Sequence, residues 1–186
     1  MNATMGMMRL VHGRAAMLGL LLTGCTPDRP PPSPVQFSGL PASGSLALAK
    51  RSGFTSCINM NAVSLRCRKH RVMFLGQGPY EAAVDLRGDK GQSGFDHLVL
   101  WHDEDQRALY DALIPLHRKG WRACITGTER AGDQAIFTLP GAPVWISVDI
   151  TYYGKRRLRI FPKAIAPRLS TACTPQTRLR IFNLNV

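Results

Sequence analysis

The segment from Trp145 to Tyr153 carries the strongest structural pattern in the chain, because apolar and polar residues alternate along it. An alternation of period two is typical of a β-strand with one buried face. The apolar positions that we expect to face a core are Ile146, Val148, Ile150 and Tyr152. One such strand is not stable alone, so the chain must supply a sheet around it.

A second strand is predicted at residues 157–161, where Leu158 and Ile160 alternate with arginines. A two-residue loop between the strands would bury those arginines. A three-residue connection, 154–156, instead places Tyr152 opposite Leu158, so we predict an odd loop or a bulge here. The exposed face of the pair is then expected to carry Asp149, Thr151, Tyr153, Arg157 and Arg159.

Other strands are predicted from short apolar or alternating runs bounded by turn residues. Residues 95–101 are apolar on both faces, which indicates a central strand. In residues 80–86, Tyr80, Ala82, Val84 and Leu86 are expected to point to one side. The remaining predicted strands are 54–58, 63–68, 71–75, 121–126 and 134–139.

One principal helix is predicted at about residues 103–116. Asp103 followed by Gln106 resembles a capping box, and acidic residues in the first turn suit the helix dipole. Pro115 is expected to end or kink the helix. Its predicted buried stripe is Ala108, Leu109, Ala112, Leu113 and Leu116.

These elements together predict a single α+β domain at residues 45–186. We expect a mostly antiparallel sheet of six to eight strands, packed with the helix at about 103–116. A chain of this length can bury a substantial core. A shorter helical segment is predicted at 46–51, after Ser45.

Residues 1–24 have the features of an export signal. Arg9 and Arg14 form a basic region, and residues 15–22 form an apolar run. The run is too short to cross a bilayer as a helix, which needs about 20 apolar residues.

The signal ends in Leu22-Thr23-Gly24-Cys25, which resembles the lipobox of bacterial lipoproteins. The resemblance covers residues 1–25 and implies that Cys25 is lipidated after cleavage before it. Thr26, where an aspartate would favour retention in the inner membrane, implies a place in the outer membrane facing the periplasm. A secretory signal with a chance cysteine is the alternative. Residues 25–44 are rich in proline and are predicted to be a tether.

Four further cysteines remain, which in an oxidising compartment indicates two disulfides. They are Cys57, Cys67, Cys124 and Cys173. Three connectivities are possible, and we favour Cys57–Cys67 with Cys124–Cys173. The spacing does not favour a metal site, because there is no Cys-x-x-Cys pair. No cofactor is indicated.

The formal net charge is +12, and no acidic residue follows Asp149. For an exported protein, the expected partners are an anionic envelope component, a phospholipid surface or an acidic protein, and not nucleic acid. The sequence Arg-Leu-Arg-Ile-Phe occurs at 157–161 and again at 178–182. The predicted binding residues are Tyr153, Arg157, Arg159, Arg178 and Arg180.

The sequence is therefore compatible with two main functions. The first is a non-catalytic envelope lipoprotein that binds through a basic face, with an inhibitor of envelope-attacking enzymes as a variant. The second is a periplasmic hydrolase that uses His97 or His102 with Asp96 or Asp103. No Gly-x-Ser-x-Gly nucleophile motif is present. Convergence of these histidines and carboxylates in a pocket would favour the hydrolase. A purely structural envelope component is a third reading.

Overall fold

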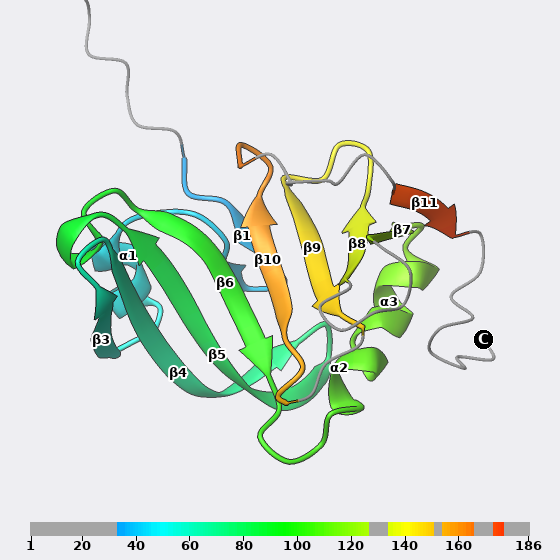
Figure 1. The fold of residues 1–186 in the computed structure, drawn as a ribbon, viewed down its shortest axis with the longest axis horizontal. Coiled ribbons are helices and arrows are strands. Elements are labelled where there is room, and N and C mark those ends of the chain that lie inside the picture. Colours follow the sequence, from blue (N-terminus) through cyan, green and yellow to red (C-terminus); the bar gives the residue numbers. More distant parts are fainter. Residues whose placement is uncertain (1–32, 127–133, 151–153, 166–172, 177–186) are drawn as a thin grey trace, which may run out of the picture. The chain divides into compact units, whose positions relative to one another are not determined.

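The computed structural model describes residues 33–126, 134–150, 154–165 and 173–176 (Figure 1). The chain divides into two units, residues 1–31 and 32–186, and every described residue belongs to the second unit. The elements are β1 (Gln36–Phe37), β2 (Leu40–Pro41), α1 (Leu46–Arg51), β3 (Ser56–Asn61), β4 (Ser64–Phe74), β5 (Gln77–Arg87), the 3₁₀ helix η1 (Asp89–Gly91), β6 (Phe95–Trp101), α2 (Ala108–Asp111), α3 (Leu113–Arg118), β7 (Arg122–Thr126), β8 (Gln134–Thr138), β9 (Val144–Asp149), β10 (Leu158–Pro162) and β11 (Cys173–Gln176).

The main feature is a nine-stranded sheet in the order β11-β7-β8-β9-β10-β6-β5-β4-β3. All of its pairings are antiparallel, as predicted. β6 lies between β5 and β10, which confirms that residues 95–101 form a central strand. The helices are short, so the fold is nearer to all-β than to the predicted α+β class. Within the described ranges, no helix has the length and hydrophobicity needed to span a membrane.

The prediction of one helix over 103–116 was wrong, because two shorter helices stand there. α2 begins at Ala108, and its N-cap residue, Arg107, makes no side-chain capping bond. Asp103 does not cap a helix but accepts a hydrogen bond from Nε1 of Trp101 at 3.2 Å. Pro115 explains the break, because it has no N–H to donate and its ring would clash with the carbonyl of Asp111, where α2 ends.

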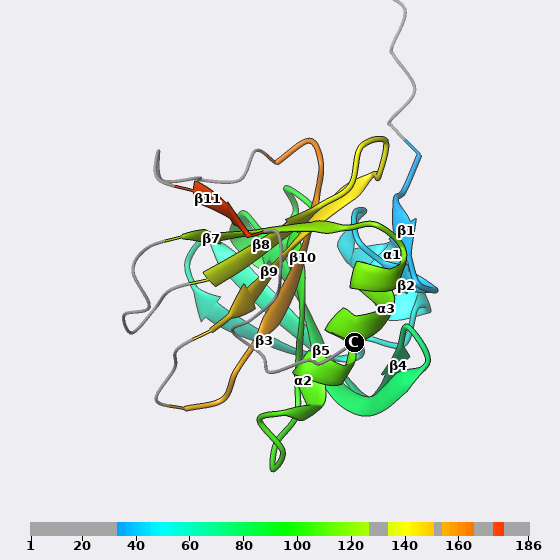
Figure 2. The same ribbon diagram turned by 90° about the vertical axis from the view of Figure 1, so that its right-hand side faces the viewer.

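The core lies on one face of the sheet, beneath the helices. Figure 2 shows α1, α3 and the β1–β2 hairpin on the same side of the strands. The apolar positions of β5 are confirmed to face this core, with Tyr80 at 2% exposure and Leu86 at 0%. The helical stripe is buried there too: Leu109, Ala112, Leu113 and Leu116 are inaccessible and Ala108 is partly buried.

The N-terminal boundary of the folded unit differs from the prediction. Residues 36–42 fell within the predicted tether, yet they form β1, β2 and a buried segment. Leu40 and Ala42 belong to the core, and the ring of Phe37 packs edge-on against Trp121 at 5.5 Å. The proline-rich composition concealed these few apolar residues, whose burial depends on distant partners.

The strands β9 and β10 pair in a register that differs from the prediction. Leu158 lies opposite Val148, and the connection begins after Asp149, whose N–H bonds the carbonyl of Arg157. The predicted opposition of Tyr152 and Leu158 is therefore wrong by four residues. The shift is an even number, so the predicted sharing of faces is retained. Residues 151–153, including Tyr153, lie outside the described part of the chain.

β4 joins two predicted strands, 63–68 and 71–75, into one. Its register with β5 shifts between Lys69 and Val72, and Arg71 has a positive φ of 55°, as expected of a bulge. The long strand brings residues 64–74 alongside β5 as one hairpin.

The Cys57–Cys67 disulfide is confirmed, and the two residues face each other across β3 and β4. Cys124 is also disulfide-bonded. The backbone of Cys173 lies in β11, next to β7, but its side chain is outside the described residues, so the Cys124–Cys173 pairing stays a prediction. Arg178 and Arg180 lie outside the described ranges as well.

Candidate functional site

The sheet has a second face, opposite the core, which we call the outer face. The strand registers set its side chains in rows. In one row Arg68 lies opposite Ala83, Ala83 opposite Val99, and Val99 opposite Arg159. In the neighbouring row Arg66 lies opposite Asp85, which lies opposite His97. Charged residues from strands that are far apart in the sequence therefore meet on this face.

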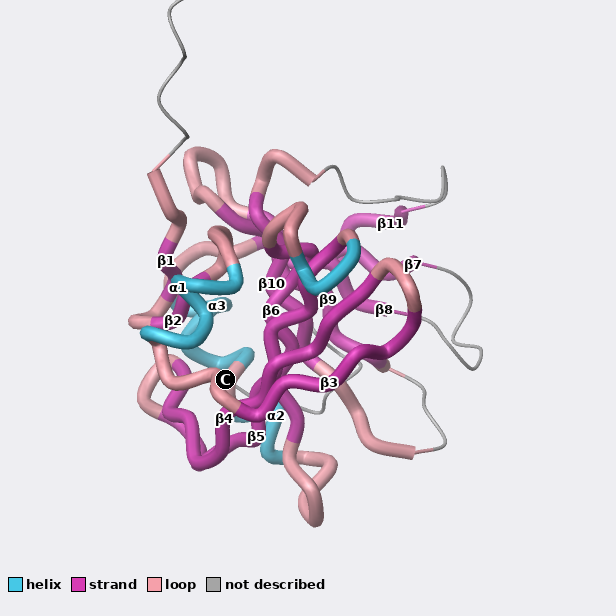
Figure 3. Tube along the Cα trace, turned by 90° about the vertical axis from the view of Figure 1, so that its left-hand side faces the viewer, coloured by secondary structure: helices cyan, strands magenta, loops and turns pink. Residues whose placement is uncertain are grey.

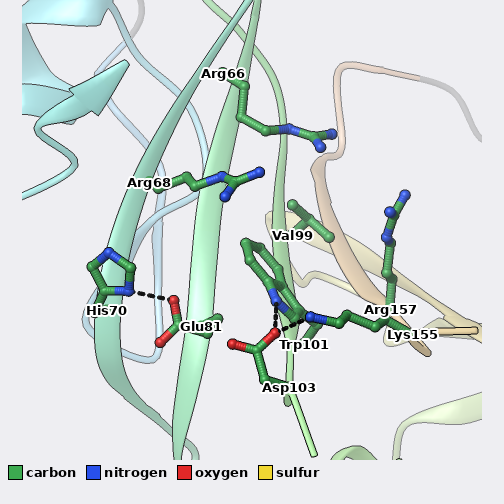
Figure 4. A pocket seen from close by; sticks show the side chains of 9 residues that line it. All are labelled: Arg66, Arg68, His70, Glu81, Val99, Trp101, Asp103, Lys155 and Arg157. Atoms are coloured by element: carbon green, nitrogen blue, oxygen red, sulfur yellow. Dashed lines mark hydrogen bonds and ion pairs between the residues drawn. The ribbon is translucent and has the colours of Figure 1, made fainter. Parts of the chain in front are cut away.

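A cleft of about 260 Å³ opens on the outer face across β4, β5, β6 and the segment before β10 (Figure 4). Val99, only 1% exposed, supplies an apolar floor. Four cationic side chains stand around it, with one indole, one imidazole and two carboxylates. The lining residues are Arg66, Arg68, His70, Glu81, Val99, Trp101, Asp103, Lys155 and Arg157.

Two of the four cations are held by carboxylates. Nε and Nη2 of Arg66 donate to the two oxygens of Asp85 at 2.6 and 2.7 Å. This paired hydrogen bond raises the pKa of the Arg66 guanidinium above its ordinary value. Lys155 donates to Asp103 at the mouth of the cleft, and this bond lowers the pKa of the Asp103 carboxyl group.

The other two cations, Arg68 and Arg157, have no carboxylate within ion-pair distance among the described residues. The Arg68 guanidinium lies 5.9 Å from the centroid of the Trp101 ring, a cation–π contact that leaves its N–H donors available. Glu81 is paired with His70, whose Nδ1 lies 2.5 Å from Oε2 of the glutamate. The cleft therefore offers two arginines without a carboxylate partner among the described residues, over a partly apolar surface.

The chain was compared with protein families, curated proteins and solved structures. No protein-family model, curated protein or solved structure matches this chain.

The predicted basic face of β9 and β10 is only partly exposed. Asp149 is 5% exposed, and Nη1 of Arg159 donates to it at 2.7 Å. Nε2 of Gln134 and the backbone N–H of Arg157 donate to the same carboxylate. The prediction that Asp149 is exposed was wrong, because these donors surround its carboxylate, and Arg159 is only partly exposed. Of the predicted binding residues that the structure describes, Arg157 alone lines the cleft.

The histidines of the hydrolase hypothesis do not converge on one pocket. His97 lies between Asp96, 2.9 Å from Nδ1, and Asp85, 3.2 Å from Nε2, and its ring stacks on Phe161 at 4.9 Å. Nδ1 of His102 accepts the backbone N–H of Asp105 at 2.8 Å within a turn. Both imidazoles thus hold the local structure together. No cluster of three potential metal ligands occurs among the described residues.

Several lining residues were not singled out from the sequence, chiefly Arg66, Arg68, Trp101 and Lys155. A signal was present, because Arg66, Arg68 and His70 recur at every second position, as do Arg157 and Arg159. Alternation shows that each set shares a face. It does not show that β4 and β10 lie on opposite sides of the β5–β6 pair, which depends on the sheet order.

Proposed function

We propose that this protein is a membrane-anchored envelope lipoprotein whose folded unit is a non-catalytic binding module for an anionic ligand. The cleft binds the anionic group between Arg68 and Arg157. The observation that carries the proposal is the absence of carboxylate partners for these two arginines within the described residues, while the other two cations of the lining, Arg66 and Lys155, are each paired with a carboxylate.

The chemistry of the cleft favours a compact oxyanion such as a phosphate group. A guanidinium presents several N–H donors in a fixed plane, which matches phosphate or carboxylate oxygens. Val99 and the Trp101 ring lower the local polarity, which strengthens the attraction between ligand and arginines. The volume of about 260 Å³ suits one small group and not a long polymer segment.

Titration of the protein with glycerol 3-phosphate, followed by calorimetry, tests the proposal. Arg68→Ala/Arg157→Ala should weaken binding by roughly 10- to 100-fold, since hydrogen bonds to charged groups contribute about 1.5–3 kcal/mol. Higher salt should weaken the wild-type interaction.

The matched control is Arg51→Ala/Arg118→Ala, which removes the same charge from exposed residues of α1 and α3. An equal loss of affinity in both double variants would mean that net charge alone attracts the ligand, and the proposed site would be rejected.

The anchor at Cys25 is the second part of the proposal and rests on the lipobox resemblance. The Cys25→Ser variant, expressed in a bacterium, should lose the added mass of the acyl chains and leave the membrane fraction. A variant that kept the wild-type mass and stayed with the membrane would refute lipidation.

A further inference from the structure

Exposed apolar side chains gather at the edge of the sheet next to the cleft. Four large apolar side chains in the described residues are strongly exposed: Ile58 at 47%, Met60 at 48%, Val63 at 65% and Met73 at 54%. Ile58 and Met60 lie on β3, and Val63 lies in the turn that joins β3 to β4. We call Ile58, Met60 and Val63 the apolar rim. Figure 3 shows the side of the molecule that carries β3.

The rim adjoins the cationic part of the cleft. Ile58 is paired directly with Arg66, so the two side chains project from the same face of neighbouring strands. Arg66 lines the cleft, and Arg68 follows it on the same face. The Cα atoms of Ile58 and Arg68 are roughly 8 Å apart, because the two residues are separated by one strand spacing across the sheet and by two residues along it. A single small molecule can therefore span Ile58 and Arg68, while Met60 and Val63 follow Ile58 in the direction away from Arg68.

The edge is also held firmly in place. β3 is the last strand of the sheet, and the Cys57–Cys67 disulfide fixes it to β4 directly beside Ile58. At Met60 the register shifts, because Asn59 lies opposite Leu65 and Asn61 lies opposite Ser64. Met60 is thus the extra residue of a bulge, which bends a strand and deters edge-to-edge pairing. An apolar cluster kept exposed on a rigid edge is typical of a contact surface.

We infer that the ligand of the cleft is a phosphate-bearing amphiphile, an anionic lipid. Its phosphate group lies between Arg68 and Arg157, and its acyl chains cover the apolar rim. This inference rests on the proposed function and adds the class of ligand to it. Charge complementarity selects the phosphate end, and the continuity of rim and cleft selects an apolar group attached to it.

The test compares two probes that share a phosphate monoester and differ in acyl chains. Glycerol 3-phosphate and monomeric dihexanoyl phosphatidic acid are each titrated into the whole chain. We expect the lipid to bind at least tenfold more tightly than glycerol 3-phosphate. Ile58→Ser/Met60→Ser should abolish that gain and leave the affinity for glycerol 3-phosphate unchanged. Met73→Ser, which also replaces an exposed apolar residue, should keep the gain.

The outcomes separate the inference from the proposed function. If glycerol 3-phosphate binds and the acyl chains add nothing, or if the rim variant keeps the gain, the inference fails while the anion site stands. If neither probe binds, both fail. If the rim variant changes the oligomeric state in sedimentation, a second copy of the chain covers the rim and the lipid assignment is overturned. Dihexanoyl phosphatidylcholine should bind more weakly than the phosphatidic acid, and equal affinity would contradict the role of the arginines.

Discussion

Arg159 and Asp149 form a nearly buried ion pair on the outer face, with Nη1 of the arginine 2.7 Å from Oδ1 of the aspartate. The Asp149 side chain is 7% exposed and the Arg159 side chain 19%. The pair lies between the central strands β9 and β10, beside the cleft residue Arg157. The nearly buried Asp149 carboxylate is tolerated because the Arg159 guanidinium is bonded to it.

Replacement of Arg159 alone should therefore destabilise the fold. We expect Arg159→Met to lower the free energy of unfolding by about 3–5 kcal/mol, because it leaves the Asp149 carboxylate buried without its cation. Urea unfolding measures the change. Arg159→Met/Asp149→Asn should recover part of the loss, and Arg118→Met, on an exposed residue of α3, should have little effect. A double variant that is less stable than Arg159→Met would contradict this account.

Asp85 restrains Arg66 and should therefore limit the affinity of the cleft. Asp85→Asn removes the charge that holds the guanidinium and makes Arg66 available to an anion. We expect phosphate to bind about three- to tenfold more tightly, as a charge-assisted hydrogen bond is transferred from Asp85 to the ligand. Calorimetry provides the measurement. Asp89→Asn, which removes an equal charge from η1, serves as the control, and an equal gain there would show that the effect is only long-range.

Tyr80 should make stability depend on alkaline pH. Burial, followed by the charges of Asp111 and Asp105, raises the pKa of Tyr80 from 10.0 to about 12. Its hydroxyl donates to the carbonyl of Ala108 at 2.9 Å. Because the folded pKa is the higher one, the stabilising effect is complete below about pH 10 and is lost as the pH rises through the folded pKa.

Tyr80→Phe lacks this group, so wild type should be more stable by about 0.5–1.5 kcal/mol near neutral pH. The difference should shrink as the pH rises above about 10. Urea unfolding of both proteins over this range is the appropriate measurement. A difference that stays constant across the range would show that Tyr80 ionises no differently in the folded chain.

The Cys57–Cys67 disulfide should contribute directly to stability. It closes a short loop with a sequence separation of 10, for which chain-entropy arguments give about 2–3 kcal/mol. Cys57→Ser/Cys67→Ala should lower the free energy of unfolding by that amount. It should also reduce the gain that acyl chains add to binding, because β3 loses its covalent link to β4. Unfolding and lipid titration measured on the same variant would show whether the two effects occur together.

The alternation of side chains was predictable from sequence because it depends only on neighbouring residues. Tyr80 and Leu86 face the core as expected, and Leu158 shares a face with Val148. The exact register was not predictable. Two registers that differ by four residues bury the same apolar positions, so the local pattern does not distinguish them.

The cleft itself depends on contacts between distant strands. Arg68 and Arg157 line the same cleft only because β10 pairs with β6, β6 with β5, and β5 with β4. Composition predicted a basic surface but not which arginines are compensated. Asp149 and Asp85 neutralise Arg159 and Arg66, and these pairings follow from the tertiary arrangement.

The hairpin β1–β2 sets the distance over which an anchored domain could move. Val35 is held to the folded unit, since its carbonyl accepts the backbone N–H of Ala42 and its own N–H bonds Oγ of Ser43 at 2.7 Å. Ten peptide units separate it from Cys25. If Cys25 carries lipid, a segment of this length spans at most about 35 Å, against about 65 Å for a tether that ran to Gly44. That upper limit would keep Val35 within roughly one bilayer thickness of the membrane surface if Cys25 is lipidated, so the local concentration of lipid headgroups around the protein would be high.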